Sequence, residues 1–185
     1  DRDLFEDAFA RQREEHVPFR GKNRAEGIER GFFICPQCGE LGKIRGVGDH
    51  VLCDCGLNLY YTEEGFFEPP TPVETVADWE TIQRQAMDNL CSEAEAVLFS
   101  DDGFTLRKIE NGHGETDLGR GTLSQTPDAL KIAGEIFPLS EINSMAMVKA
   151  HILLFSAGDS YYEIRADAGQ CLRKYLMVWQ NKNKE

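Results

Sequence analysis

Short apolar runs alternate with turn residues through the second half of the chain. The runs are rich in Val, Ile, Leu and Phe and are bounded by Asp102-Gly103, 111–114, Pro127-Asp128 and Gly158-Asp159. They predict strands at 97–99, 104–109, 121–124, 129–133, 136–139, 145–148, 152–155 and 161–165. A meander of roughly seven short strands predicts a β-barrel or a β-sandwich.

Helical spacing of apolar residues predicts two helices in the first half. One covers 3–15, where the apolar positions are Leu4, Phe5, Ala8 and Phe9. The other follows Pro69, Pro70 and Pro72, with Thr75 as its expected N-cap and Asp78 completing a capping box. The apolar face of this second helix consists of Val76, Trp79, Ile82, Ala86 and Leu90.

A third amphipathic helix is predicted at the C-terminal end, with Asp167 as its N-cap. Its apolar stripe consists of Ala168, Cys171, Leu172, Tyr175, Leu176 and Trp179. A single helix in this place commonly covers the open end of a small barrel.

Four of the six cysteines stand in two tight pairs that have the spacing of metal ligands. Cys35-Pro36-Gln37-Cys38-Gly39 is a CPxCG knuckle, and Cys53-Asp54-Cys55-Gly56 follows after fourteen residues, a length that suits a returning β-hairpin. Strands are predicted at 32–34, 43–45 and 57–62, which make a three-stranded ribbon, and 51–52 leads to the second cysteine pair. We therefore predict one structural zinc ion bound by Cys35, Cys38, Cys53 and Cys55.

The second pair is CxC, one residue shorter than the usual CxxC, and this makes Cys55 the least secure ligand. His50 is the competing ligand, although its place in the predicted hairpin turn is unfavourable. A module that binds iron, or no metal, remains the alternative to zinc. An all-thiolate zinc site has no open coordination position, so we expect it to be structural and not catalytic.

Charge and composition limit the functions and the compartment that fit this chain. A formal net charge of −12 argues against nucleic acid as a partner, because its phosphates are bound chiefly by Lys and Arg. The paired cysteines favour a reducing, cytoplasmic compartment over a disulfide framework. The first residues carry no signal-peptide pattern and no initiator Met, so we expect a fragment of a longer chain.

No convincing catalytic constellation is found in the sequence. His113 and Asp117 stand in a turn rich in Gly and acidic residues, where a solvated loop is the expected outcome. Cys91 and Cys171 lie on predicted helix faces beside apolar residues and are expected to be ordinary buried thiols, and His151 borders an apolar strand. We therefore expect no enzyme activity from this segment.

The order of knuckle, helix and β-domain resembles the C-terminal extension of some bacterial 1-acylglycerol-3-phosphate acyltransferases. The resemblance rests on the two cysteine pairs, on YYTEEGFFE at 60–68, on the Trp79 helix and on FPLSEI at 137–142. By itself the β-domain looks like a pleckstrin-homology domain: seven strands, the PLxxI strand at 138–142 and a closing helix. The resemblance implies an α+β chain in which a small rubredoxin-like zinc ribbon precedes a pleckstrin-homology-like seven-stranded β-barrel closed by a C-terminal helix.

The same resemblance implies a function. The acyltransferase family works through His, four residues and then Asp, whereas His50–Asp54 and His113–Asp117 each enclose three residues. We therefore expect a non-catalytic accessory region, with lysophosphatidate acylation carried by an N-terminal catalytic domain of the same parent chain. A protein partner or the inner membrane surface is the expected contact; the acidic loop 110–117 argues against a phosphoinositide. The alternative is a stand-alone protein-binding scaffold with a structural zinc site.

The predicted domain organisation has four parts. Residues 1–30 form an N-terminal helical segment, and 31–68 form the zinc ribbon. Residues 69–94 are a linker with the amphipathic helix, and 95–185 form the β-domain with its C-terminal helix.

Overall fold

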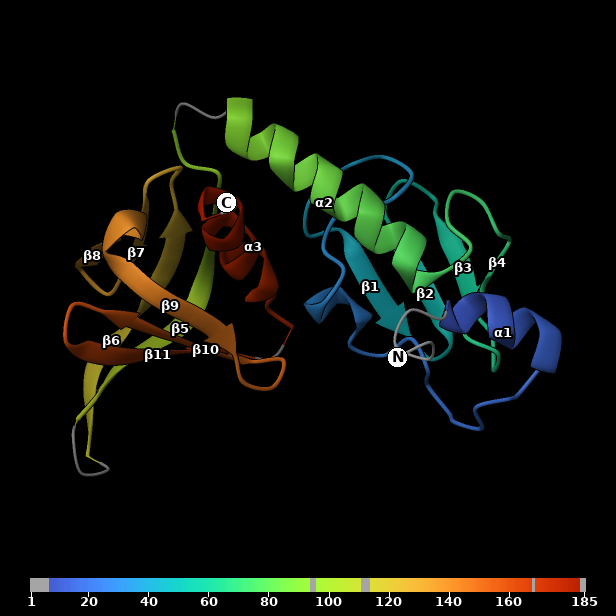
Figure 1. Cartoon of the computed structure of the whole chain (residues 1–185), viewed down its shortest axis with the longest axis horizontal. Coiled ribbons are helices and arrows are strands. Elements are labelled where there is room, and N and C mark those ends of the chain that lie inside the picture. Colours follow the sequence, from blue (N-terminus) through green and yellow to red (C-terminus); the bar gives the residue numbers. More distant parts are fainter. Residues whose placement is uncertain (1–6, 94–95, 111–113, 168, 184–185) are drawn as a thin grey trace. The chain divides into compact units, whose positions relative to one another are not determined.

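The computed structural model describes residues 7–93, 96–110, 114–167 and 169–183, which form an α+β chain (Figure 1). The chain divides into two compact units. The first unit comprises Asp1–Ile28 with Ile34–Gln83, and the second comprises Glu29–Phe33 with Arg84–Glu185. Helix α2 (Val76–Glu93) therefore contributes its first turns to the first unit and its last turns to the second. The predicted division at residues 30, 68 and 94 stays a prediction.

The first unit contains an antiparallel sheet of four strands in the order β1-β2-β3-β4. The strands are β1 (Ile44–Val47), β2 (His50–Cys53), β3 (Asn58–Tyr61) and β4 (Phe67–Glu68). The sequence predicted β1 and β3. It predicted 51–52, where β2 lies, only as the segment that leads to the second cysteine pair, and it did not predict the edge strand β4. Val51, Leu59 and Phe67 are buried on the sheet, and the fully buried Trp79 of α2 meets the Phe67 ring edge-on at 5.6 Å.

The predicted strand at 32–34 is wrong. Only one residue of this stretch is paired as in a sheet, through an isolated antiparallel bridge between Ile34 and Leu41. The backbone C=O and N–H of Ile34 bond instead to side chains of α2, so no second strand extends the pairing.

Two close contacts, at Arg24 and at Ala25, hold the loop that precedes β1 against the sheet. The Arg24 side chain, 11% exposed, donates to the Tyr61 carbonyl oxygen at 2.9 Å and the Tyr60 hydroxyl at 2.8 Å, and it pairs with Asp49. Gly46 passes so close to Ala25 that a Cβ would overlap the Ala25 carbonyl oxygen. Only glycine fits this crossing.

The N-terminal helix α1 (Ala8–Glu15) begins at its N-cap Asp7, whose side chain accepts from the Phe9 backbone N–H at 2.9 Å. Residues 3–6 of the predicted helix lie outside the described part of the chain. None of the residues of α1 is buried. The helix is held to the unit by the Phe9–Phe66 ring contact and by Arg13, which donates to Glu74 at 2.8 Å.

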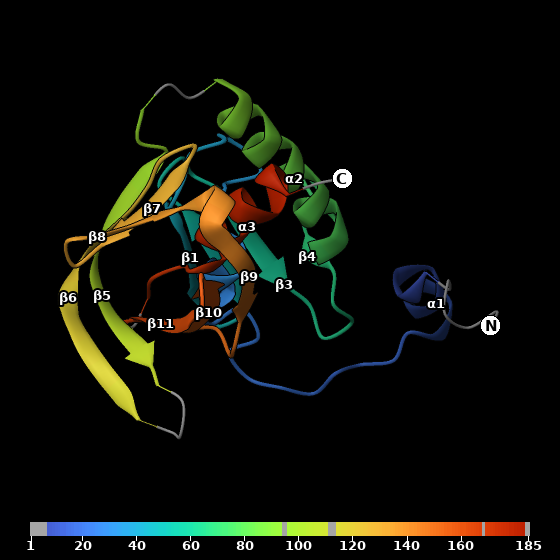
Figure 2. The ribbon, with the colours of Figure 1, turned by 60° about the vertical axis from the view of Figure 1, so that its left-hand side comes forward.

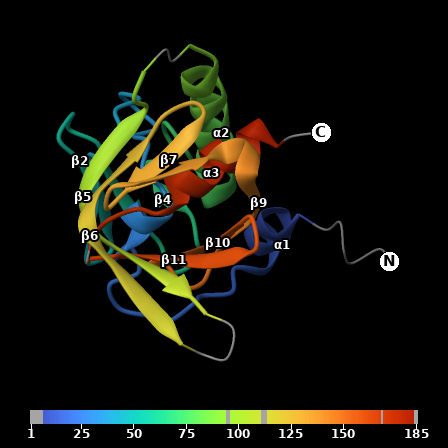
Figure 3. The same cartoon turned by 90° about the vertical axis from the view of Figure 1, so that its left-hand side faces the viewer.

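The second unit is built on a seven-stranded antiparallel sheet in the order β8-β7-β6-β5-β11-β10-β9. The strands are β5 (Phe99–Ile109), β6 (Glu115–Gln125), β7 (Ala129–Ile132), β8 (Glu135–Pro138), β9 (Ile142–Met147), β10 (Ile152–Ala157) and β11 (Ser160–Ala166). The sheet curls around helix α3 (Arg173–Lys182), with β5 and β6 as its long curved strands (Figures 2 and 3). With β8 and β9 as its two edges, the sheet is a half-barrel, where the sequence predicted a barrel.

Side chains fill the concave face of this half-barrel. Phe104, Leu106, Leu123, Leu130 and Ile164 of the sheet are all buried. At one side, rings from three strands form an aromatic cluster in which centroids lie 4.8 to 5.2 Å apart: Phe137, Phe155 and Tyr162. This packing makes the concave face a core and not a ligand cavity.

Helix α3 closes the core through Tyr175, which is fully buried between the rings of Phe99 and Phe104. Its hydroxyl donates to Asp101 Oδ2 at 2.6 Å and is 2.9 Å from the Leu123 carbonyl oxygen.

The predicted turn at Asp102-Gly103 is wrong, because β5 continues through it as one strand. The register with β6 shifts between Asp101 and Phe104, and Gly103 has φ +87°, as at a β-bulge. The Asp102-Gly103 sequence therefore produces a bend within β5 and not a turn between two strands. The predicted turn at 111–114, which includes His113, lies outside the described residues except for Gly114.

The predicted N-cap of the last helix is also wrong. The helix begins at Arg173 and not after Asp167, which pairs with Arg120 of β6 instead. Ala168 lies outside the described residues. Of the other positions of the predicted stripe, Cys171, Leu172 and Tyr175 are buried, whereas Leu176 and Trp179 are partly exposed.

The capping box of α2 is confirmed. The Thr75 backbone N–H donates to Asp78 Oδ2 at 2.8 Å, and the Asp78 backbone N–H donates to Thr75 Oγ1 at 3.2 Å. The buried positions of the helix are Trp79, Gln83 and Met87, so its inner face includes a polar residue that the apolar pattern passed over. Within the described residues, no helix has the length and apolar character needed to cross a membrane.

Candidate metal centre

The first knuckle folds as its CPxCG sequence requires. The Gly39 backbone N–H donates to the Cys35 carbonyl oxygen at 2.9 Å, and the Cys35 backbone N–H donates to the Glu40 carbonyl oxygen at 3.0 Å. Gly39 has φ +76°, a conformation that strongly favours glycine. The turn thereby brings the Cys38 side chain back toward that of Cys35.

The second knuckle closes in the same way with one residue fewer. The Gly56 backbone N–H donates to the Cys53 carbonyl oxygen at 3.0 Å, three residues back instead of four, and Gly56 has φ +95°. The Cys53 backbone N–H in turn donates to the Leu57 carbonyl oxygen at 3.1 Å. The shorter turn still points Cys55 at the first knuckle, so the missing residue does not remove the fourth thiol.

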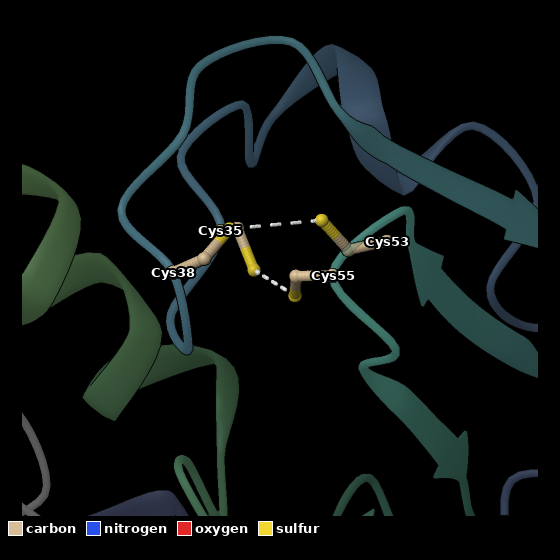
Figure 4. A group of neighbouring side chains, drawn as sticks. All are labelled: Cys35, Cys38, Cys53 and Cys55. Atoms are coloured by element: carbon tan, nitrogen blue, oxygen red, sulfur yellow. Dashed lines mark hydrogen bonds between the residues drawn. The ribbon is translucent and has the colours of Figure 1, made fainter.

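The four sulfur atoms gather at one point (Figure 4), all within 4.8 Å of one another. The Cys35 and Cys55 sulfurs are 3.7 Å apart, and those of Cys38 and Cys53 are 3.9 Å apart. Four thiolates at about 2.3 Å from a tetrahedral metal ion lie about 3.8 Å from one another. The cluster therefore has the donor set for a metal ion, and two of its sulfur–sulfur distances match those of a tetrahedral site.

The site is half buried. Cys35 and Cys53 are 1% and 6% exposed, whereas Cys38 and Cys55 face solvent. Burial raises the pKa of Cys35 to about 12 and raises that of Cys53, while a backbone hydrogen bond from Leu57 lowers the pKa of Cys55. The two buried thiols, Cys35 and Cys53, therefore favour the neutral form unless a cation balances the charge of their thiolates.

Two polar groups border the exposed side of the cluster. Gln37, between the first two cysteines, has its side-chain amide nitrogen 3.6 Å from the Cys55 sulfur. Arg45 of β1 pairs with Asp54, between the last two, at 2.7 Å. The sequence-based predictions included neither Gln37 nor Arg45. Gln37 stands inside the CxxC pair, and Asp54, the partner of Arg45, stands inside the CxC pair; these positions are the signal that could have identified them.

The remaining candidates lie elsewhere. His50, the competing ligand, has its ring 2.9 Å from the Asn58 side-chain oxygen and is not part of the cysteine cluster. Cys171 is buried and its thiol lies 3.1 Å from the Arg30 carbonyl oxygen; burial raises its pKa. Cys91 is half-buried, His151 is exposed and His113 lies outside the described residues.

Comparisons with models of protein families, with curated proteins and with solved structures found no match.

Proposed function

We propose that the cysteine cluster is a structural zinc site of the ribbon kind, bound by Cys35, Cys38, Cys53 and Cys55. The observation that carries the proposal is the spacing of the four sulfur atoms. Two of the sulfur–sulfur distances, 3.7 and 3.9 Å, are close to the value of about 3.8 Å expected for thiolates around a tetrahedral ion. Four protein ligands leave no position for a substrate, so the ion organises the fold. Zinc is favoured over other divalent ions because tetrahedral sites with four thiolates are typical of it.

The ion would stabilise the end of the sheet where the knuckles meet. Binding of structural zinc to small domains contributes on the order of 10 to 16 kcal/mol at neutral pH. The apolar core of the first unit lies around Val51, Phe67 and Trp79, while the two knuckles are held by the few backbone bonds described above. We expect the knuckles to depend on the metal more than the rest of the unit does.

Metal analysis of the purified chain tests this part of the proposal. We expect one zinc per chain, lost in Cys55→Ser and retained in Cys91→Ser, a matched change at a cysteine outside the cluster. A chain that binds no metal, or that keeps a full zinc equivalent in Cys55→Ser, would refute the four-thiolate site.

We further propose that the second unit is a pleckstrin-homology-like binding module. The meander of seven antiparallel strands followed by one helix supports this reading. Because side chains fill the concave face, a partner would contact the outer strands, the edges β8 and β9 or the connecting loops.

The parent chain would be a phospholipid-synthesising acyltransferase, and this segment its non-catalytic accessory region at the cytoplasmic side of the membrane. This part of the proposal is supported by the shared motifs at the cysteine pairs, at 60–68 and at 137–142. The partner would be the N-terminal catalytic domain, a further protein or the membrane surface.

Enzyme assays distinguish a non-catalytic accessory region from a segment that is itself an acyltransferase. The purified segment should not transfer acyl groups to lysophosphatidate, whereas the full-length gene product should. Acyl transfer by the segment alone would refute an accessory role. A gene that encodes no catalytic domain would instead support the stand-alone scaffold.

A further inference from the structure

We propose that Trp79 and Gln83, on one face of α2, are positioning residues for the metal centre, because they hold the peptide groups of Ile34, next to the ligand Cys35. The inference rests on the proposed zinc site and adds residues that no cysteine pattern reveals. We call Trp79, Gln83 and Ile34 the clamp.

The pairing of the first knuckle explains why Ile34 needs outside partners. Its bridge with Leu41 is formed through the bond from the Cys35 N–H to the Glu40 carbonyl oxygen, so Ile34 and Leu41 are a non-hydrogen-bonded pair. In such a pair the N–H and C=O of Ile34 point away from the partner segment. Ile34 is only 2% exposed, so these groups are shielded from water and need other partners.

Helix α2 supplies both partners from consecutive turns. The Trp79 indole N–H donates to the Ile34 carbonyl oxygen at 2.8 Å. Gln83 Oε1 accepts from the Ile34 N–H at 3.4 Å, a longer bond. Both side chains are fully buried, and residues four apart lie on one face of a helix.

The carbonyl group that Trp79 holds belongs to the peptide bond that leads into Cys35. Cys35 is the most buried of the four thiols, and its sulfur must meet that of Cys55 from the far knuckle. Groups that orient metal ligands commonly change metal affinity by about 10- to 100-fold when they are removed. The clamp therefore contributes to metal retention by limiting the movement of the first ligand.

The cleanest perturbation is Gln83→Met, which keeps the length of the side chain and removes the acceptor. Gln85→Met is the matched control, because Gln85 is exposed on the same helix and bonds only locally, to Asn89 at 3.1 Å. Trp79→Phe removes the indole donor and keeps an aromatic ring in the core. Leu59→Ala, in the core at β3, controls for loss of stability without change to the clamp.

Two readouts separate positioning from general stability. The first is the rate of zinc transfer to a colorimetric chelator, which we expect to rise about tenfold in Gln83→Met and in Trp79→Phe. The second is the visible spectrum of the Co²⁺-substituted chain, whose tetrahedral thiolate bands should shift or weaken in the clamp variants. Gln85→Met should match the wild type in both, and Leu59→Ala should keep the wild-type Co²⁺ spectrum.

The outcomes distinguish the two proposals. If the wild-type chain binds no metal, the zinc site itself fails, and the clamp role fails with it. If the wild type binds zinc but both clamp variants transfer it at the wild-type rate with an unchanged Co²⁺ spectrum, only the clamp role is refuted. If Leu59→Ala reproduces both effects of the clamp variants, general stability explains them and the positioning role is overturned.

Discussion

Removal of one hydroxyl group, in Tyr175→Phe, should destabilise the second unit by about 2 kcal/mol. The phenol of this fully buried residue lies 2.6 Å from Asp101 Oδ2 and 2.9 Å from the Leu123 carbonyl oxygen. A hydrogen bond to a charged group contributes about 1.5 to 3 kcal/mol. We take a value in the lower half of this range because Lys174, 2.5 Å from the same carboxylate, still pairs with it in the variant.

The Tyr175 hydroxyl also makes the difference in stability between wild type and Tyr175→Phe depend on pH. Burial, followed by the neighbouring Asp101 carboxylate, raises the pKa of Tyr175 far above its usual value near 10. The phenol stays neutral in the folded chain but ionises in the unfolded one, so its stabilisation is complete below pH 10 and is lost as the pH rises above it. At pH 11 the loss is about 1.4 kcal/mol. The difference between wild type and Tyr175→Phe should therefore shrink from about 2 kcal/mol at pH 8 to about 0.6 kcal/mol at pH 11.

Urea denaturation followed by methyl NMR measures this difference within the second unit. The methyl groups of Ile132 and Ile164 are buried in that unit, and unlike amide protons they do not exchange at high pH. Tyr161→Phe is the matched control, because Tyr161 is 57% exposed; it should change stability by less than about 0.5 kcal/mol. A difference for Tyr175→Phe that stays constant or grows between pH 8 and pH 11 would show that the phenol is not held neutral by its site.

Three further predictions concern the first unit. The methyl signals of Val51 or the amide signals of β1 to β3 report the first two, and the amide signals of the knuckles report the third. Gly46→Ala should destabilise the unit by about 3 kcal/mol or more, since the new Cβ overlaps a backbone oxygen, whereas Gly21→Ala, whose Cβ would lie at an ordinary 3.8 Å from Arg24 Cγ, should be tolerated. Arg24→Met should cost about 3 kcal/mol because it removes the cation beside the partly buried Asp49 carboxylate, which keeps only the backbone N–H of residue 24, and leaves the Tyr61 carbonyl and Tyr60 hydroxyl without this donor. The exposed Arg20→Met should cost little, and equal urea midpoints would contradict this. Chelation with EDTA at pH 7 should collapse the amide dispersion of the two knuckles, and re-addition of zinc should restore it; unchanged spectra would contradict a structural metal.

Local sequence signals correctly predicted much of the fold. Strands β7, β10 and β11 came within three residues of their predicted bounds, because each ends at a segment with a Gly or Asp turn signal. The capping box of α2 is an equally local device, in which Thr75 and Asp78 satisfy each other's backbone N–H groups. The CPxCG knuckle is likewise formed by residues that are close together in the sequence.

Predictions failed where a distant segment decided the outcome. Asp102-Gly103 has the composition of a turn, but β6 pairs with β5 both before and after it, and β11 pairs from Phe104 onward, so β5 stays a single strand that bends there. Asp167 has the chemistry of an N-cap, but its side chain pairs with Arg120 and the helix begins later. In both places a long-range contact outweighs a local preference of about 1 kcal/mol.

The four cysteines show the same division most clearly. Their identity and spacing determined, from the sequence alone, that a metal site was to be sought at 35–55, because thiols in close pairs can reach one ion. Only the tertiary structure decided that Cys55 lies within 3.7 Å of Cys35 despite the shortened pair, since that distance depends on how the hairpin returns. It also decided that Trp79 and Gln83, more than forty residues away in sequence, hold the peptide groups before the first ligand. Ligand chemistry is a property of the residues, whereas the positions of the ligands are a property of the packed chain.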